Sequence, residues 1–264
     1  MSNKIFKAAD SYTLPSQDLR ALLEMVTSPE LTAASLADRR KLFLSGMATL
    51  LQADIGVWSW GRGFSVDGGI QPVAMIDHGM TMPQKTHLAE AGLDRKNDLE
   101  FRALIIRRMD ETRRATVIRE DIYSDAEWDR KPSFRRICDG LGMTSWITSV
   151  LYPRPDTWCN ITYWRKANRG ELGERERQLL DLVMSSVSWL LPTVRETVPA
   201  ETFTGLTPRQ RTVLLLLLDG LSRKSIAAEL KLTEHTVGDH VKSIYQHFQV
   251  HSVNELAAQM LKSI

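Results

Sequence analysis

Apolar and polar positions alternate in the last sixty residues with the three- and four-residue steps of an α-helix. The pattern predicts four helices, each beginning at a side chain that can cap an N-terminus. The capping residues are Thr207, Ser222, Thr233 and Ser252. Gln210 and Glu255 stand three residues after two of these caps and complete capping boxes, while Gly220 occupies a position suited to a left-handed C-terminal cap. The segment therefore predicts an all-α unit of four helices.

The first 190 residues mix helical spacing with short β-branched and aromatic runs. Helices are expected at Ser16–Met25, Leu36–Leu51, Asn97–Met109, Ser133–Leu141 and Glu171–Leu191. Strands are expected at Ile55–Trp60, Ile70–Met75, Ser145–Tyr152 and Thr157–Arg165, with turns at Gly61–Gly69 and Pro153–Asp156. This order predicts an α+β fold, an antiparallel sheet with helices on its faces.

Composition changes near residue 200 and suggests two domains. All seven Trp lie before this point. Residues 204–264 carry seven basic and five acidic groups, whereas the basic and acidic groups of the preceding residues are equal in number. Pro192, Pro199 and several Thr are typical of a linker. We therefore expect a sensor and dimerisation domain over 1–191, a linker over 192–204 and a second domain over 205–264.

Several classes of protein are disfavoured by the sequence. The longest unbroken apolar run, Val213–Leu218, is far shorter than the ~20 residues of a membrane span. Charged residues interrupt the N-terminus where a signal peptide would be apolar, and Cys138 and Cys159 form neither a CxxC pair nor a disulfide framework. The chain is expected to be cytoplasmic.

The second and third predicted helices, joined by the short connection Lys231–Leu232, form a helix-turn-helix pattern. The third predicted helix spans about Thr233 to Phe248. Its apolar residues lie on one face, which is expected to pack in the core, and its opposite face is polar. A helix of this kind fits a DNA major groove. Pattern alone leaves a second interpretation open, a small four-helix bundle that binds no nucleic acid.

The string LTPRQRTVLLLLLDGLSRKSIAAELKLTEHTVGDHVKSIYQHFQVHSVNELA closely resembles the LuxR/FixJ (GerE-type) DNA-binding domain. The resemblance implies a homodimer that binds double-stranded DNA at an imperfect palindrome. Residues that fall at or beside its DNA-contacting positions are Arg223, Lys224, Thr233, His235, Thr236, Asp239, His240, Lys242 and Ser243. Lys242 matches a position that reaches bases, and Lys224 and Thr236 match positions near phosphates. Gly238 departs from the pattern, since the family often has Lys or Arg there.

The stretch FRRICDGLGMTSWITSVLYP, with the strand and helix after it, resembles the closing part of GAF-like and autoinducer-binding sensor domains. The resemblance implies a GAF/PAS-like fold that binds a small molecule between sheet and helices. Candidate pocket walls are Trp58, Trp60, Met75, Trp128 and Trp146, each of which could instead be plain core. Acyl-homoserine-lactone receptors carry a Tyr-x3-Trp-x3-Tyr run and an Asp-Pro, and neither occurs here, which disfavours that ligand class.

The sequence offers no catalytic constellation and implies no cofactor. Phosphate-binding loops, HExxH and a complete nucleophile elbow are absent. His235 and His240 are five residues apart, so they do not share a helix face, and no metal site is expected. The arginines at 107, 108, 113, 114 and 119 are expected to form a solvated face, with an anion- or DNA-facing surface as the alternative.

These observations predict a sequence-specific transcription regulator, not an enzyme, that dimerises through Glu171–Leu191 and responds to a small molecule or partner. RNA polymerase is a further candidate partner. The alternative is a sigma-like or adaptor protein whose terminal helices contact polymerase or another protein.

Overall fold

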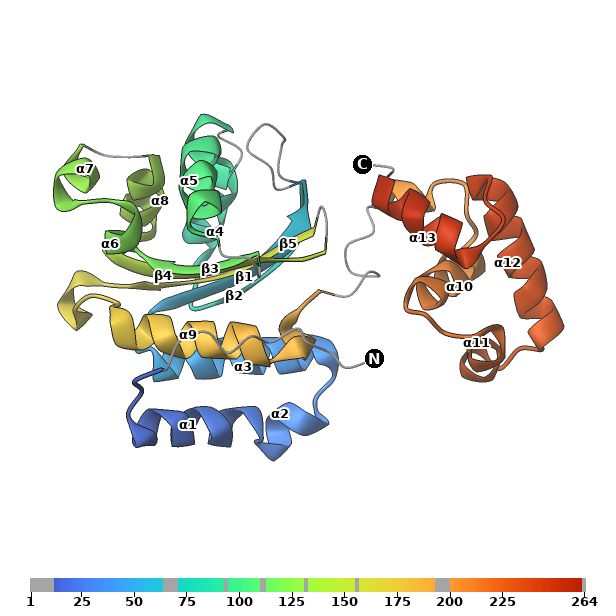
Figure 1. Ribbon diagram of the computed structural model, residues 1–264, viewed down its shortest axis with the longest axis horizontal. Helices are drawn as coiled ribbons and strands as arrows, with labels where there is room; N and C mark the ends of the chain where they lie inside the picture. The colour runs from blue at the N-terminus through green and yellow to red at the C-terminus, as the bar shows by residue number, and fades with distance from the viewer. Residues whose placement is uncertain are drawn as a thin grey trace. The chain divides into compact units, whose positions relative to one another are not determined.

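The computed structural model describes residues 12–63, 71–92, 95–109, 113–130, 133–154, 157–192 and 200–262. The chain folds as two compact units, Met1–Leu191 and Pro192–Ile264 (Figure 1). Among the described residues, no helix combines the length and hydropathy that a bilayer crossing requires. Most of the expected Gly61–Gly69 turn, part of the Pro153–Asp156 turn and residues 193–199 of the expected linker lie outside the described residues.

The N-terminal unit is built on a five-stranded sheet in the order β2-β1-β5-β4-β3, and each pairing of neighbouring strands is antiparallel. The strands are β1 Ile55–Arg62, β2 Gln71–His78, β3 Arg114–Ile118, β4 Ser145–Arg154 and β5 Thr157–Arg165. The predicted antiparallel sheet is thus confirmed. β3 was not predicted, because its five residues begin with an arginine and are too few to show a clear alternation.

Helices cover both faces of this sheet (Figure 1). One face packs against helices of the first fifty residues and of the end of the unit, which are α1 Ser16–Val26, α2 Pro29–Ala33, α3 Leu36–Leu50 and α9 Glu174–Ser186. The other face carries α4 Met82–Gly92, α5 Arg95–Arg108, α6 Arg119–Ile122, α7 Asp125–Asp129 and α8 Ser133–Leu141. The α+β prediction with helices on both faces is confirmed, while α2, α4, α6 and α7 were missed.

Alternation along the strands divides the interior into two cores. Trp58, Ile161 and Tyr163 face α3 and α9, whereas Trp146 and Trp164 face α5 and α8. Consecutive residues of a strand therefore point to opposite faces of the sheet and pack in different cores. Residues two positions apart on a strand contact the same set of helices.

Ion pairs attach α9 to the rest of the unit. Arg175 contacts both carboxylate oxygens of the buried Asp18 at 2.7 Å, which joins α9 to α1. On the outer flank, Asp181 accepts hydrogen bonds from Tyr12 and Thr116, each at 2.7 Å. Such charge-assisted bonds are roughly twice as strong as neutral ones, so the helix is held firmly in register on the sheet.

The last residues of this unit are anchored by a buried arginine of α3. The Arg40 guanidinium lies 4.9 Å from the Trp58 ring and 5.1 Å from the Trp60 ring, and it donates to the Leu191 carbonyl at 3.1 Å. Only 2% of Arg40 is exposed. A cation over two indole faces is favourably placed when water is excluded.

The described part of the C-terminal unit contains four α-helices, α10 Pro208–Leu218, α11 Arg223–Leu230, α12 Glu234–Phe248 and α13 Val253–Lys262, after a short 3-10 helix, η4 Ala200–Phe203. Thr207 accepts from the Gln210 backbone N–H, as the predicted capping box requires, and Gly220 adopts φ +83° after α10. Val213, Leu214 and Ile244 are completely buried between the helices. The predicted all-α four-helix unit is confirmed.

Candidate nucleic-acid interface

The turn between α11 and α12 is tight and is fixed by its backbone. Ser222 caps α11 and Thr233 caps α12, each through its side-chain oxygen. Lys231 ends α11 in the left-handed conformation at φ +52°, and the Leu232 N–H returns to the Ala227 carbonyl at 2.9 Å. This 6→1 bond is the Schellman ending of a helix. Two helices joined in this way form a helix-turn-helix, as the sequence predicted.

One face of α12 is committed to the core and the opposite face is open. Val237, Val241 and Ile244 are fully buried. Successive residues turn by about 100° around a helix axis, so His235 and Lys242 point away from that buried face. The helix therefore exposes a polar face while its apolar face stays packed in the core of the unit.

This polar surface is a groove of about 890 Å³. It is lined by Arg223, Glu234, His235, Gly238, Asp239, Lys242, Tyr245, Gln246, Gln249, Val250 and His251. Two cations, Arg223 and Lys242, and two carboxylates, Glu234 and Asp239, contribute to it, so the formal charges of these four side chains cancel. The groove therefore offers hydrogen-bond donors and acceptors rather than strong positive charge.

The predicted DNA-binding residues divide between the groove and its surroundings. Arg223, His235, Asp239 and Lys242 line the groove, whereas Lys224 is exposed beside it on α11. The Thr233 and Thr236 hydroxyls hydrogen-bond one another at 2.9 Å at the start of α12. His240 and Ser243 are half-buried on the adjacent flank, and the Ser243 hydroxyl donates to the Asp239 carbonyl at 3.0 Å.

Sequence reasoning did not include the lower part of this groove among the candidate sites. Gln246 and Gln249 continue the face of Lys242 at helical steps of four and three, which is the signal that could have found them. Tyr245 was assigned to the core, yet it is half-buried and also lines the groove. His251 follows the end of α12 and reaches the groove only because Gln249 turns the chain at φ +54°.

Gly238 leaves a gap in the middle of this surface. A Cβ added at this position would meet no described atom within 4 Å. The glycine is therefore not required by packing, and it contributes no side chain to the groove.

Comparison with known families identifies this segment. Residues 204–260 match the model of the bacterial regulatory proteins of the luxR family. This segment is a LuxR-family domain. The family is one of DNA-binding transcription regulators, and the predicted resemblance of this segment to it is confirmed.

Solved structures give more distant similarities. Escherichia coli SdiA is 14% identical, with 92% of this chain and 94% of that chain covered at a TM-score of 0.41. SdiA in complex with octanoyl-rac-glycerol is 13% identical, with 94% and 95% covered at a TM-score of 0.41. The LBD domain of VqsR from Pseudomonas aeruginosa is 10% identical, with 66% and 92% covered at a TM-score of 0.43. A search of curated protein sequences found no significant match.

The structure places the five candidate pocket residues of the N-terminal unit on both faces of the sheet. Trp58 and Trp60 lie in the core under α3, whereas Trp146 lies in the core on the opposite face of the sheet. Met75 is 44% exposed, and Trp128 packs beside Tyr123 at the edge of the second core. The five candidates therefore lie in different parts of the unit, and their role as pocket walls stays a prediction.

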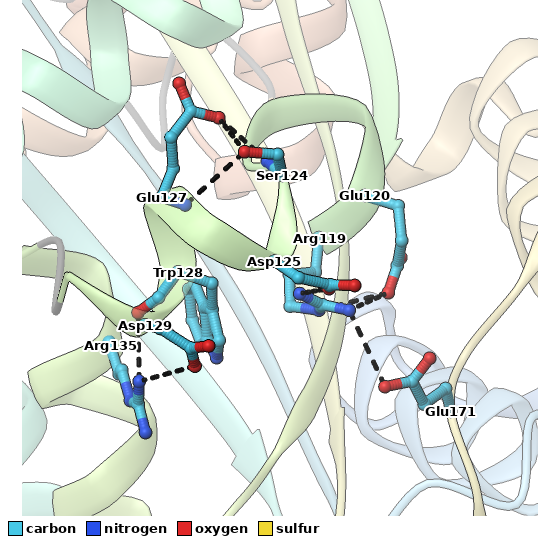
Figure 2. Close-up of polar contacts among 9 residues, drawn as sticks. All are labelled: Arg119, Glu120, Ser124, Asp125, Glu127, Trp128, Asp129, Arg135 and Glu171. Carbon is cyan, nitrogen blue, oxygen red and sulfur yellow. Dashed lines mark hydrogen bonds and ion pairs between the residues drawn. The ribbon is translucent and has the colours of Figure 1, made fainter.

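The expected solvated arginine face is also wrong for two of its members. Arg114 pairs with Asp181 at 3.1 Å. Figure 2 shows Arg119 between three carboxylates, with Glu120 and Asp125 at 2.8 Å and Glu171 at 3.7 Å. Burial opposes the charge of Arg119, but the bond to Asp125 and the neighbouring carboxylates outweigh it and raise its pKa. These arginines join elements of the fold, while Arg107 and Arg108 remain exposed.

A polar row crosses the sheet on the face toward α5 and α8. The Ser59 hydroxyl contacts Asn160, the Asn160 amide donates to Thr162 at 3.1 Å, and the Thr162 hydroxyl meets Thr148 at 2.8 Å. Beside it, the fully buried Trp146 has an indole N–H without a hydrogen-bond partner among the described residues. An unsatisfied buried donor is uncommon in folded proteins.

The described side chains offer no cluster that could hold a metal ion. No group of three or more His, Cys, Asp or Glu within this part of the chain could hold a metal ion. Cys138 is buried, and desolvation raises the pKa of its thiol to about 12, so the thiol is protonated at neutral pH. A protonated thiol is a weak nucleophile.

Proposed function

We propose that the protein is a homodimeric transcription regulator whose groove along α12 reads a palindromic operator. The observation that carries this proposal is the open polar face of α12, set by a tight turn behind α11 inside a LuxR-family domain. Arg223 and Lys242 supply donors for guanine or phosphate, and Glu234 and Asp239 supply acceptors for cytosine N4. Because donors and acceptors occur together on one surface, the groove suits base edges better than a uniform charge would.

Binding to both halves of a palindrome requires two copies of the protein. We propose that α9 forms the interface between them. Its inner side packs on the sheet through Leu179, Leu180 and Val183. Its outer side carries an exposed Arg177–Glu174 pair at 2.7 Å. An isologous contact between two such helices would place the arginine of one protomer near the glutamate of its partner.

In vitro selection from random duplex DNA tests both parts of this proposal. The full-length protein should enrich duplexes with two inverted half-sites centred about one helical turn apart, or a multiple of it. Sedimentation of the protein on such a duplex should give two protomers per DNA. Enrichment of a single, non-repeated site, or one protomer per duplex, would contradict the dimer. Failure to enrich any sequence would favour the alternative, an adaptor that contacts polymerase or another protein.

The N-terminal unit is proposed to bind a small-molecule effector against the α5–α8 face of the sheet. The unpartnered Trp146 N–H supports this, since it could donate to a carbonyl oxygen of a ligand. Phe101 and Phe134, at 5.6 and 4.8 Å from the Trp146 ring, would contact an apolar body. The hydroxyls and amide of the polar row would bind a polar head group. An effector acts by binding one conformation more tightly than another.

Trp146→Phe tests this effector site. The substitution keeps an aromatic ring and removes the N–H, so the affinity for a carbonyl-containing ligand should fall by about 0.5–1.5 kcal/mol. Quenching of the remaining Trp by octanoic acid, its monoglyceride and its methyl ester would measure the affinities. Trp128→Phe, at the edge of the same core, is the matched control. If a ligand binds with the same affinity to wild type, Trp146→Phe and Trp128→Phe, the Trp146 N–H does not contact that ligand.

A further inference from the structure

Gly238 lies in the middle of the groove along α12, and no contact among the described residues requires a glycine there. An added Cβ would meet no atom within 4 Å beyond its chain neighbours and the local helix backbone. The residue is not among the glycines with a positive φ, so its conformation suits any amino acid. Glycine is also less favourable than alanine inside a helix. The missing side chain can therefore have its effect only on the open side of the helix, toward a ligand of the groove.

Longer side chains surround this position. Glu234 and His235 precede Gly238 by four and three residues, and Lys242 follows it by four; all of them line the groove. Residues at these spacings are neighbours on the surface of a helix. His235 and Lys242 therefore lie on either side of a notch whose floor is the backbone of Gly238. Carbon atoms pack best at about 3.5–4.0 Å, so the space around the added Cβ position is large enough for one methyl group.

The floor of the Gly238 notch is apolar. Gly238 lies within the helix Glu234–Phe248, where the backbone N–H and carbonyl groups are paired along the helix axis. The residue therefore presents only its Cα hydrogens to the groove. A polar base edge placed there would lose its water without gaining a hydrogen bond, which is unfavourable, whereas a methyl group has no hydrogen bond to lose.

The apolar group that B-DNA presents in its major groove is the C5 methyl of thymine, while the other groups at the base edges are hydrogen-bond donors and acceptors. We propose that Gly238 is a specificity-determining residue that admits a thymine methyl group into the notch between His235 and Lys242. This inference rests on the proposed function of the groove. It goes further by naming the chemical group that the middle of α12 recognises.

The expected preference follows from the apolar surface that the methyl group buries. Replacing thymine with uracil removes this methyl and leaves the hydrogen-bonding groups of the base unchanged. Burial of one methyl group corresponds to roughly fourfold in affinity. A dimer that binds two half-sites should therefore prefer thymine to uracil by roughly fifteenfold when the position is changed in both.

The experiment uses the full chain and a fluorescent duplex recovered by selection. Uracil would replace the thymines of the half-site one position at a time, in both half-sites together, and anisotropy titrations at fixed salt would measure each affinity. The variant Gly238→Ala adds a methyl group to the protein where the DNA methyl is expected. Asn254→Ala is the matched control, because Asn254 is exposed on α13 and lies outside the groove. Hydrogen exchange of α12 in the full chain would report the stability of this helix.

Wild type and Asn254→Ala should lose roughly fifteenfold in affinity when uracil replaces one particular thymine of the half-site. Gly238→Ala should bind the thymine duplex at least about fivefold more weakly than wild type, because two methyl groups cannot fill one space. It should bind the duplex with uracil at that position at least as well as the thymine duplex. Its α12 amides should exchange no faster than those of wild type, since alanine favours the helix. A purely structural role of Gly238 would not abolish the preference for thymine at one position.

Two results would overturn the inference while leaving the groove as a DNA-binding site. The first is a wild type that binds its selected duplex equally well with thymine or uracil at every position, or that selects half-sites without thymine. The second is a Gly238→Ala variant that keeps the full preference for thymine at each position where wild type shows one. Failure of the selection to enrich any duplex would overturn both the inference and the function on which it rests.

Discussion

Replacing Arg40 with alanine is expected to lower the free energy of unfolding of the N-terminal unit by about 3–4 kcal/mol. The guanidinium lies against the rings of Trp58 and Trp60 and holds the Leu191 carbonyl. Alanine removes these contacts and leaves a cavity in a core that is otherwise filled. It also leaves the Leu191 carbonyl without this donor, at a site where the arginine is almost completely shielded from water.

The variant Arg40→Met distinguishes the contribution of the guanidinium charge from that of the volume that the side chain fills. Methionine restores much of the apolar stem and requires no desolvation of a cation, and replacing buried charges by apolar residues of similar volume is often close to neutral. The loss should then be under about 1.5 kcal/mol. Urea unfolding followed by Trp fluorescence would measure both variants, since all seven Trp belong to this unit. Equal losses for alanine and methionine would show that the cation itself, rather than the filled volume, stabilises the core.

Replacing Lys242 with alanine is expected to weaken binding to a selected operator by about 1–3 kcal/mol, or roughly 5- to 150-fold. Lys242 is exposed in the groove on the face of α12 opposite the buried Val241 and Ile244. If its ammonium group donates to guanine, the variant should lose discrimination at one base pair. If it contacts only phosphate, affinity should fall uniformly across sequences and the salt slope should decrease by about 1.

The matched control for this change is Lys231→Ala. Lys231 is an exposed lysine of the same unit, but it lies in the turn and not in the groove. Competition titrations against scrambled duplexes at two salt concentrations would report affinity and discrimination together. An unchanged affinity of Lys242→Ala for the selected duplex would mean that another surface of the LuxR-family domain reads the DNA.

The C-terminal unit could be predicted closely because its signals are local. Ser222 and Thr233 each cap the helix that the sequence assigned to them, and Gly220 ends α10 with a positive φ. A cap depends only on residues three or four positions away, so no knowledge of the fold is needed. The apolar spacing of α12 then determined which face would remain open.

The arrangement of the candidate effector site could not be predicted in the same way. Trp58 and Trp60 are two residues apart on β1, so the sequence implies that they share a face. Whether Trp146 joins them depends on the strand order β1-β5-β4 and on the pairing of Trp146 with Trp164. These are relations between segments some ninety residues apart, and hydrophobic spacing carries no information about them.

The short elements were missed for a related reason. α4 spans Met82–Gly92, where few apolar residues mark a buried face, and its contact with α8 includes a hydrogen bond from Gln84 to the Leu141 carbonyl at 2.7 Å. α7 contains five residues and depends on the Ser124–Glu127 capping box. The burial of Arg119 could not be predicted either, because the carboxylates that surround it include Glu171, which is distant in sequence.

The vacant position at Gly238 makes the groove easy to alter during evolution. A Cβ placed there would meet no described atom within 4 Å, and replacing this mid-helix glycine with alanine would gain up to about 1 kcal/mol of helix stability. A single codon change could therefore add a donor, an acceptor or a methyl group to the surface without disturbing the fold. Duplicated copies of this gene could thus come to control different sets of promoters in one mutational step.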